Sequence, residues 1–159
     1  MSVSAYPVVL FLHSWVRWAV VLLGVLALVR ALGGWRGGRE WTRGDRRLQV
    51  FCVSAFDTQM LLGMVLYSGV SPFTPFSLEG GVRESLAHPT LRFFGLEHPT
   101  LMLLALVAAH VGSAVSQRAE GSVSRHRAWA LGLLVAMCLV ACAIPWTGLS
   151  HGRPLFRGL

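Results

Sequence analysis

Seven polar side chains lie inside or at the edges of otherwise apolar stretches of this sequence, and their types could bind a metal or a cofactor or relay protons. An ionisable side chain inside a membrane costs on the order of 2.5–3.5 kcal/mol by insertion scales, so each is a functional candidate by default. The alternative for any one of them is a structural role, as a packed histidine or as an ion pair that fixes which helices associate. The seven are His13, Arg17, Asp57, Gln59, Glu97, His98 and His110.

The apolar stretches that carry these residues predict an integral membrane protein. Hydrophobic residues make up 54% of the 159 residues and charged residues 13%, whereas soluble domains carry about 25% charged residues. This composition excludes an ordinary soluble globule and a disordered chain. Four runs are long enough to cross about 30 Å of hydrocarbon as helices, at residues 6–32, 48–70, 98–115 and 128–146. We expect one all-α domain over residues 1–159, an antiparallel four-helix bundle surrounded by a lipid bilayer.

The arginines predict how the helices are oriented. All 14 basic residues are arginine, and nine of them lie in the connections that follow the first and third runs, namely Arg30, Arg36, Arg39, Arg43, Arg46, Arg47, Arg118, Arg125 and Arg127. The other side has Arg83, Arg92, Arg153 and Arg157. The positive-inside rule therefore places both termini outside the cytoplasm. Anionic lipid headgroups account for the net positive charge, so no nucleic-acid partner is expected.

We expect the first apolar run to remain in the protein as a membrane-spanning helix and not to be a cleaved signal peptide. The leading MSVSAYP contains no basic residue, and the positive charge follows the first apolar run instead of preceding it. A cleaved signal peptide has the opposite order of charge and apolar run.

The polar side chains form a ladder when their depths are counted along the helices. A rise of about 1.5 Å per residue orders them from the arginine-rich side outward as His110, Asp57, Gln59, Arg17, His13, and then His98 with Glu97. Arg17 and Asp57 lie within about one helical turn of each other in depth. We therefore expect an intramembrane ion pair between these two residues, directly or through Gln59 or a water.

The outer end of the helices is the expected binding site. His13 lies one turn from Arg17 on the same helical face, and His98 lies at the depth of His13 to within about one turn. Pro99 leaves two placements open for His98. It lies at the rim if the third helix begins there, and inside the bundle if that helix begins near Leu91 and is kinked.

Two short segments are expected to cover this outer end as a lid or a docking surface. They are SPFTPF (71–76) and WTGLSHGRPLFRGL (146–159), both rich in interfacial residue types. The second segment would bring His151 to the site. A metal ion bound there would take its ligands from imidazole and carboxylate groups, here His13, His98, Glu97 and His151.

Three motifs resemble a family of small bacterial four-span membrane proteins labelled cytochrome b-like. They are HSWVRW (13–18), RFFGLEH (92–98) and IPW with the following RPLFR (144–146 and 153–157). More distantly, the chain is similar to the cytochrome b561 and superoxide oxidase class, four-helix bundles that bind haem b and exchange electrons with quinone. The resemblance implies a protein of the bacterial inner membrane that transfers electrons through a haem b or reacts with a quinone.

The same resemblance implies roles for individual residues. His13 and His98 would be the axial ligands of one haem b between the first and third helices, and Arg17 would contact a haem propionate or a quinone. Arg92, Arg153 and Arg157 would serve the propionates, and the apolar walls would be Phe11, Phe93, Phe94 and Met102. The second and fourth runs contain no histidine, so at most one bis-histidine haem is expected, and His110 is left without a histidine partner.

Two other functions remain open. In one, the polar ladder binds a metal or a lipid-soluble ligand or relays protons without haem. In the other, the chain is a structural subunit of a larger membrane complex or a homodimer. Nothing supports hydrolase or ATPase chemistry, since no nucleotide-binding loop, nucleophile elbow or zinc signature is present.

The three cysteines are better explained by packing than by chemistry. Cys138 and Cys142 are spaced by one helical turn, which could hold a soft metal or a redox pair. Cysteine also packs as a small apolar residue between helices, and this is the interpretation we favour for Cys52, Cys138 and Cys142.

Overall fold

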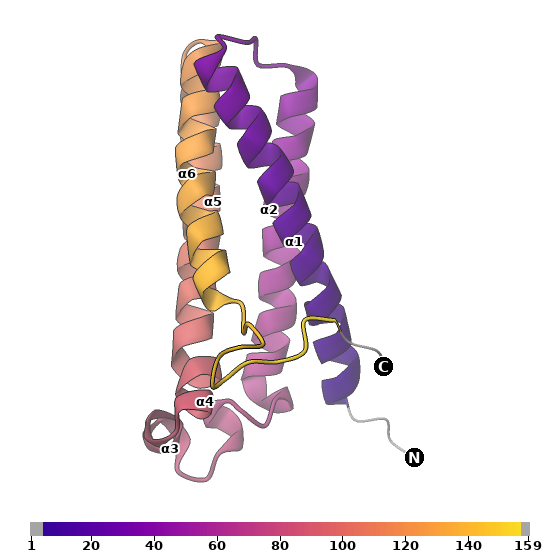
Figure 1. Ribbon diagram of the computed structural model, residues 1–159, viewed down its shortest axis with the longest axis vertical. Helices are drawn as coiled ribbons and strands as arrows, with labels where there is room; N and C mark the ends of the chain where they lie inside the picture. The colour runs from indigo at the N-terminus through magenta and orange to yellow at the C-terminus, as the bar shows by residue number, and fades with distance from the viewer. Residues whose placement is uncertain (1–4, 157–159) are drawn as a thin grey trace.

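The computed structural model describes residues 5–156, and most of them form helices (Figure 1). Four helices are long: α1 (Ala5–Arg36), α2 (Arg43–Val65), α5 (His98–Arg118) and α6 (Ser122–Ala143). Two short helices, α3 (Gly81–Ala87) and α4 (Pro89–Arg92), lie in the connection between α2 and α5. Four helical stretches are long and apolar enough to cross a membrane, as predicted: Ala5–Arg36, Arg43–Ser77, Pro89–Arg118 and Ser122–Ala143.

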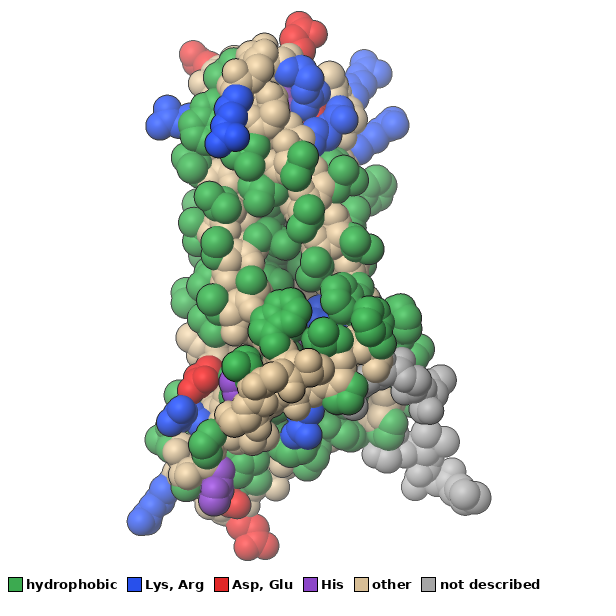
Figure 2. Space-filling view, in the orientation of Figure 1, with side chains coloured by type: hydrophobic (Ala, Val, Ile, Leu, Met, Phe, Trp, Pro, Cys, Tyr) green, Lys and Arg blue, Asp and Glu red, His purple; other side chains and the backbone are tan. Residues whose placement is uncertain are grey.

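Each long helix packs against two others. α1 contacts α2 and α6, and α5 contacts α6 and α2. The residues in the centre are mostly small, among them the fully buried Ala105, Ala109, Ala130 and Ala136. Large apolar side chains such as Leu22, Val29 and Phe51 point outward instead. Figure 2 shows apolar side chains around the middle of the molecule and basic side chains at the end where α1 joins α2 and α5 joins α6.

The contact between α5 and α6 depends on two glycines. A Cβ atom built on Gly132 would lie 2.5 Å from Cα of Gly112, and one built on Gly112 would lie 2.8 Å from Cα of Gly132. No side chain fits at this crossing, so the two backbones approach directly. Small residues at such crossings are the usual means by which membrane helices associate, because close approach increases van der Waals contact. The crossing fixes α5, which carries His98, against α6.

The start of α2 is held by a cluster of charged and hydrogen-bonding groups. Thr42 and Asp45 form a capping box, in which each side chain bonds the backbone N–H of the other residue. Asp45 is 4% exposed, and its carboxylate also accepts hydrogen bonds from Arg30 at 2.6 Å and from Arg39 at 2.8 and 3.0 Å. The guanidinium of Arg39 donates these hydrogen bonds to Asp45, and they raise the pKa of Arg39 above its ordinary value. The cluster ties α1, the connection and α2 together.

The helix that carries His98 begins before this residue. α4 continues into α5 through one π-helical turn, Phe93–Glu97, and the His98 N–H donates to the Phe93 carbonyl. Pro99 has no N–H and cannot make the usual helical hydrogen bond. The π-helical turn, which is wider than an α-helical turn, lies just before this proline. Of the two placements that the sequence left open, the structure has the earlier start, at Pro89 of α4, and the His98 ring packs against the end of α6.

The fourth long helix differs from the predicted run at both ends. It begins at Ser122 and ends at Ala143, before Pro145. Ile144, the residue before the proline, has the extended backbone that proline favours in its neighbour. The expectation that the fourth helix contains no histidine is wrong, because the earlier start places His126 within α6.

Candidate functional site

Two histidines from different helices face each other at the end of the molecule opposite the arginine-rich connections. The rings of His13 on α1 and His98 on α5 are 6.2 Å apart between centroids, with 65° between their planes. Two of the residues that the sequence assigned to a binding site are thus brought together. Two imidazoles from separate helices are a donor set suited to a transition metal or to a haem iron.

The orientation of His98 leaves one ring nitrogen available to a ligand. Its Nδ1 lies 2.8 Å from the carbonyl oxygen of Ala143, at the end of α6. A carbonyl only accepts hydrogen bonds, so Nδ1 donates and, in the neutral ring, the lone pair is on Nε2. Metal-binding histidines commonly have this arrangement, in which a carbonyl fixes the ring through one nitrogen.

His13 is held from the side of α2. Its Nε2 lies 3.1 Å from Nε2 of Gln59, so that, as placed, the amide donates and the ring accepts. A Cβ built on Gly63 would lie 3.4 Å from Cε1 of His13, an ordinary contact distance, so Gly63 also lies beside the ring. Gln59 and Gly63, one turn apart, thus form the surface of α2 beside this site.

Three buried polar atoms around the two rings have no hydrogen-bond partner within the described part of the chain. They are Nδ1 of His13, Oε1 of Gln59 and Nε2 of His151. A buried polar group without a partner costs about 1–3 kcal/mol. These three atoms thus have hydrogen-bonding capacity that residues 5–156 do not use.

The segment after α6 covers this end of the helices, as predicted. Its backbone carbonyl at Leu155 accepts hydrogen bonds from the guanidinium of Arg17 and, at 3.2 Å, from the indole of Trp18. Phe156 stacks on the Trp18 ring at 5.1 Å with 9° between the planes. In Figure 1 this yellow segment runs from the end of α6 across to α1. Arg157, expected to serve a cofactor, lies outside the described residues.

His151 reaches the site but does not join the two histidines. Its ring stacks on Phe93 with 3.6 Å between centroids and 13° between planes, and Phe93 also contacts His98 at 5.8 Å. Glu97 forms an ion pair with Arg92 at 2.7 Å, and about half of each of these side chains is exposed. Within residues 5–156, no three His, Cys, Asp or Glu side chains are grouped closely enough to hold a metal ion. Of the four residues predicted to bind a metal, the structure brings His13 and His98 together, whereas Glu97 and His151 contact Arg92 and Phe93.

The expected direct ion pair between Arg17 and Asp57 is not formed. Asp57 Oδ1 lies 2.8 Å from Nε2 of His110, while Arg17 bonds the Leu155 carbonyl. The buried face of α2 contains Asp45, Gln49, Cys52, Phe56 and Gln59. Asp57 follows Phe56 directly and is thus turned about 100° away from this face, toward α5. Equal depth did not bring the two residues together because they point in different directions.

The cysteines follow the packing interpretation only in part. Cys52 is fully buried, whereas Cys138 and Cys142 are exposed on α6, and all three are free thiols. The prediction that the latter two pack between helices is wrong.

His126 is a residue that the sequence analysis missed. It is fully buried at the arginine-rich end, where its ring lies over Gly34 of α1 and edge-on to Trp41 at 4.7 Å. The small Gly34, which makes room for the ring, was the signal available in the sequence.

No protein-family profile matches the chain, and no curated protein or solved structure is significantly similar to it.

Proposed function

We propose that this protein is a multi-pass membrane electron carrier, linked to quinone, that binds one haem b through His13 and His98 between α1 and α5. The observation that supports this proposal is the pair of facing imidazoles, 6.2 Å apart between centroids, of which His98 is already fixed through Nδ1 by the Ala143 carbonyl. The haem, when bound, supplies a one-electron couple.

The two rings are close enough to be held by one group, since their centroids are 6.2 Å apart. Each of His13 and His98 would hold the haem iron through one ring nitrogen. To ligate through Nε2, His13 would have to give up its hydrogen bond to Gln59. To ligate through Nδ1, which has no partner within the described chain, the ring would carry its proton on Nε2 and the Gln59 amide would turn its oxygen to accept it.

The surrounding side chains have the chemistry that such a group needs. Phe93 and Phe94 contact the His98 ring at 5.8 and 6.3 Å and exclude water from it. The guanidinium of Arg153 lies over the rings of Phe73 and Phe94, at 4.5 and 5.5 Å. Arg153 supplies a cation at this end for propionates or for a quinone oxygen, and Arg17, which bonds the Leu155 carbonyl, adds positive charge.

The proposed location of the protein is the bacterial inner membrane, and the arginines indicate how its helices are oriented there. The arginine asymmetry supports an antiparallel bundle in the bacterial inner membrane, with the arginine-rich connections in the cytoplasm and both termini outside. The His13–His98 site then lies in the outer leaflet, within reach of a lipid-soluble quinone.

The test is a reduced-minus-oxidised visible spectrum of the full chain, made with ample haem and purified in detergent. The expected result is a b-type Soret band and α band that His13→Ala and His98→Ala each abolish. His88→Ala is the matched control, because His88 is exposed in the α3–α4 connection, and it should leave both bands unchanged.

Absence of these bands from the unmodified protein would contradict the haem. Metal analysis of the same samples then decides between the alternatives. A metal lost in both variants would indicate a non-haem site, and a metal content unchanged in both would favour the structural subunit.

A further inference from the structure

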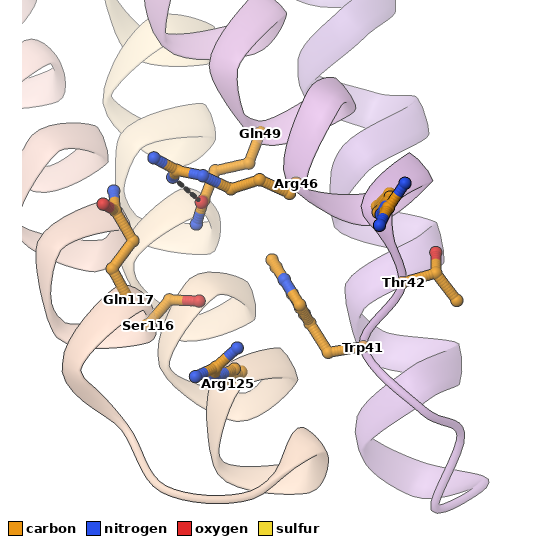
Figure 3. Close-up of a pocket in the computed structure, with 8 residues that line it drawn as sticks. Trp41, Thr42, Arg46, Gln49, Ser116, Gln117 and Arg125 are labelled. Carbon is orange, nitrogen blue, oxygen red and sulfur yellow. Dashed lines mark hydrogen bonds between the residues drawn. The ribbon is translucent and has the colours of Figure 1, made fainter.

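A second polar site lies at the opposite end of the molecule, in a cavity of about 410 Å³ between the start of α2 and the α5–α6 connection (Figure 3). It is separate from the two histidines. Its lining residues are Trp41, Thr42, Arg43, Arg46, Gln49, Ser116, Gln117 and Arg125. Three of them are arginines and none is acidic, so the cavity favours an anion.

No carboxylate among the described residues forms an ion pair with the three arginines. Asp45 is already bonded by Arg30 and Arg39, neither of which lines the cavity. Arg125 donates from Nε to the Ala119 carbonyl at 3.1 Å, which leaves the two terminal nitrogens of its guanidinium for another acceptor. The positive charge of the cavity is therefore uncompensated by the residues around it.

Two buried side chains lining the cavity have unused hydrogen-bonding atoms. Gln49 is 0% exposed and Ser116 is 1% exposed, and neither Nε2 of Gln49 nor Oγ of Ser116 has a partner within the described chain. Arg46 fixes the orientation of the Gln49 amide, since its Nη1 lies 2.7 Å from Oε1 of Gln49 and arginine can only donate. The NH₂ group of Gln49 is thus a donor without an acceptor.

We propose that this cavity binds the phosphate of an anionic phospholipid. A phosphate oxygen accepts hydrogen bonds from several donors at once and pairs with guanidinium groups in bidentate fashion, which matches three arginines, an amide NH₂ and a hydroxyl. The site lies where the apolar parts of α2 and α5 meet the arginine-rich connections, the level of a bilayer at which headgroups lie. Trp41, on the wall of the cavity, is a residue type enriched at that level.

The test uses the full chain in nanodiscs of phosphatidylcholine, with or without phosphatidylglycerol, and measures bound lipid by native mass spectrometry. Removing a charge-assisted hydrogen bond should weaken phosphatidylglycerol binding by about tenfold or more, so Arg46→Gln should have this effect. Arg47→Gln is the matched control. Arg47 follows Arg46 directly and has the same charge, but it does not line the cavity. Equal losses in both variants would overturn the proposal, since they would indicate general attraction between the charged surface and the lipid.

A variant without any change of charge provides an independent test. Gln49→Leu removes the buried NH₂ group at similar volume and should also weaken phosphatidylglycerol binding, while the thermal stability in pure phosphatidylcholine is kept or raised. Ser116→Ala should act in the same direction. Unchanged binding in both variants would contradict the proposed site. The assignment to lipid would be overturned by two results together. Inorganic phosphate would bind the protein in pure phosphatidylcholine nanodiscs, and phosphatidylglycerol in the bilayer would not stabilise it.

Discussion

His110 on α5 and Asp57 on α2 are joined by a contact of 2.8 Å between Nε2 and Oδ1, although 50% and 46% of their side chains are exposed. In a bilayer the outward face of these helices is surrounded by lipid chains, so neither group has water as an alternative partner. The pair therefore links α2 to α5 on a surface where most neighbours are lipid chains.

A double-mutant cycle on this pair should give a favourable coupling energy. Asp57→Ala and His110→Ala should couple by about 0.6 kcal/mol, with about 1.7 kcal/mol as an upper bound, the range found for hydrogen bonds between membrane helices. The measurement is unfolding in mixed detergent micelles. Thr58→Ala combined with His110→Ala is the control, because the Thr58 hydroxyl bonds the Ser54 carbonyl of its own helix. A coupling as large in the control as in the test pair would show that the contact contributes nothing specific.

Loss of the Asp45 carboxylate should destabilise the protein strongly. Asp45→Asn leaves Arg30 and Arg39 without their carboxylate partner and weakens the capping box of α2. Breaking a buried ion pair from one side costs about 3–5 kcal/mol, and the exposure of the two arginines places the expected loss near the lower end. The free energy of unfolding in detergent is the quantity to measure. Glu40→Gln, which removes the same charge from an exposed residue nearby, should change it little.

A single added methyl group should disrupt the crossing of α5 and α6. In Gly132→Ala the new Cβ would lie 2.5 Å from the Gly112 backbone, so the helices must move apart, at a cost of about 1–3 kcal/mol for overpacking. Gly33→Ala in α1 is the contrast, since a Cβ there meets no atom within 4 Å. It should be neutral or stabilise by up to about 1 kcal/mol. A thermal melt of the two variants side by side checks the difference, and equal melting temperatures would contradict the described crossing.

Loosening the covering segment should be visible in hydrogen exchange. The Arg153 amide donates to the Pro145 carbonyl at 3.1 Å, and the segment beyond it is held by Trp18 through Leu155 and Phe156. Trp18→Ala removes both contacts and should speed exchange of the Arg153 amide. Trp35→Ala, at the other end of α1, should leave that rate unchanged. Equal rates in the two variants would mean that Trp18 does not hold the segment.

The helices could be predicted from the sequence, whereas the directions of individual side chains could not. Run length and hydropathy located the four spans because a bilayer sets a minimum length for an apolar helix. Depth alone suggested that Arg17 meets Asp57, but contact also requires that both side chains point toward each other. For His13 and His98 the two requirements coincide, because the π-helical turn before His98 turns its ring toward α6 and α1.

The arginine-rich end was predicted only as a charge count. The sequence T-x-x-D before an apolar run is a recognisable start of a helix, and it would have located the Thr42–Asp45 capping box. The partners of Asp45 could not be found in this way, since Arg30 comes from another helix. The NH₂ group of Gln49 has no acceptor because Arg46 binds the oxygen of the same amide. Only the folded chain defines the rotamer of Arg46 that does so.

The covering segment also implies an order of assembly. Residues 147–156 follow all four long helices along the chain, yet they close the end at which α1 carries His13. Chains are synthesised from the N-terminus and begin to fold in that order. The segment that covers the two histidines is therefore the last part of this site to be made, and a bulky group meets an open end of the helices until the segment crosses to Trp18.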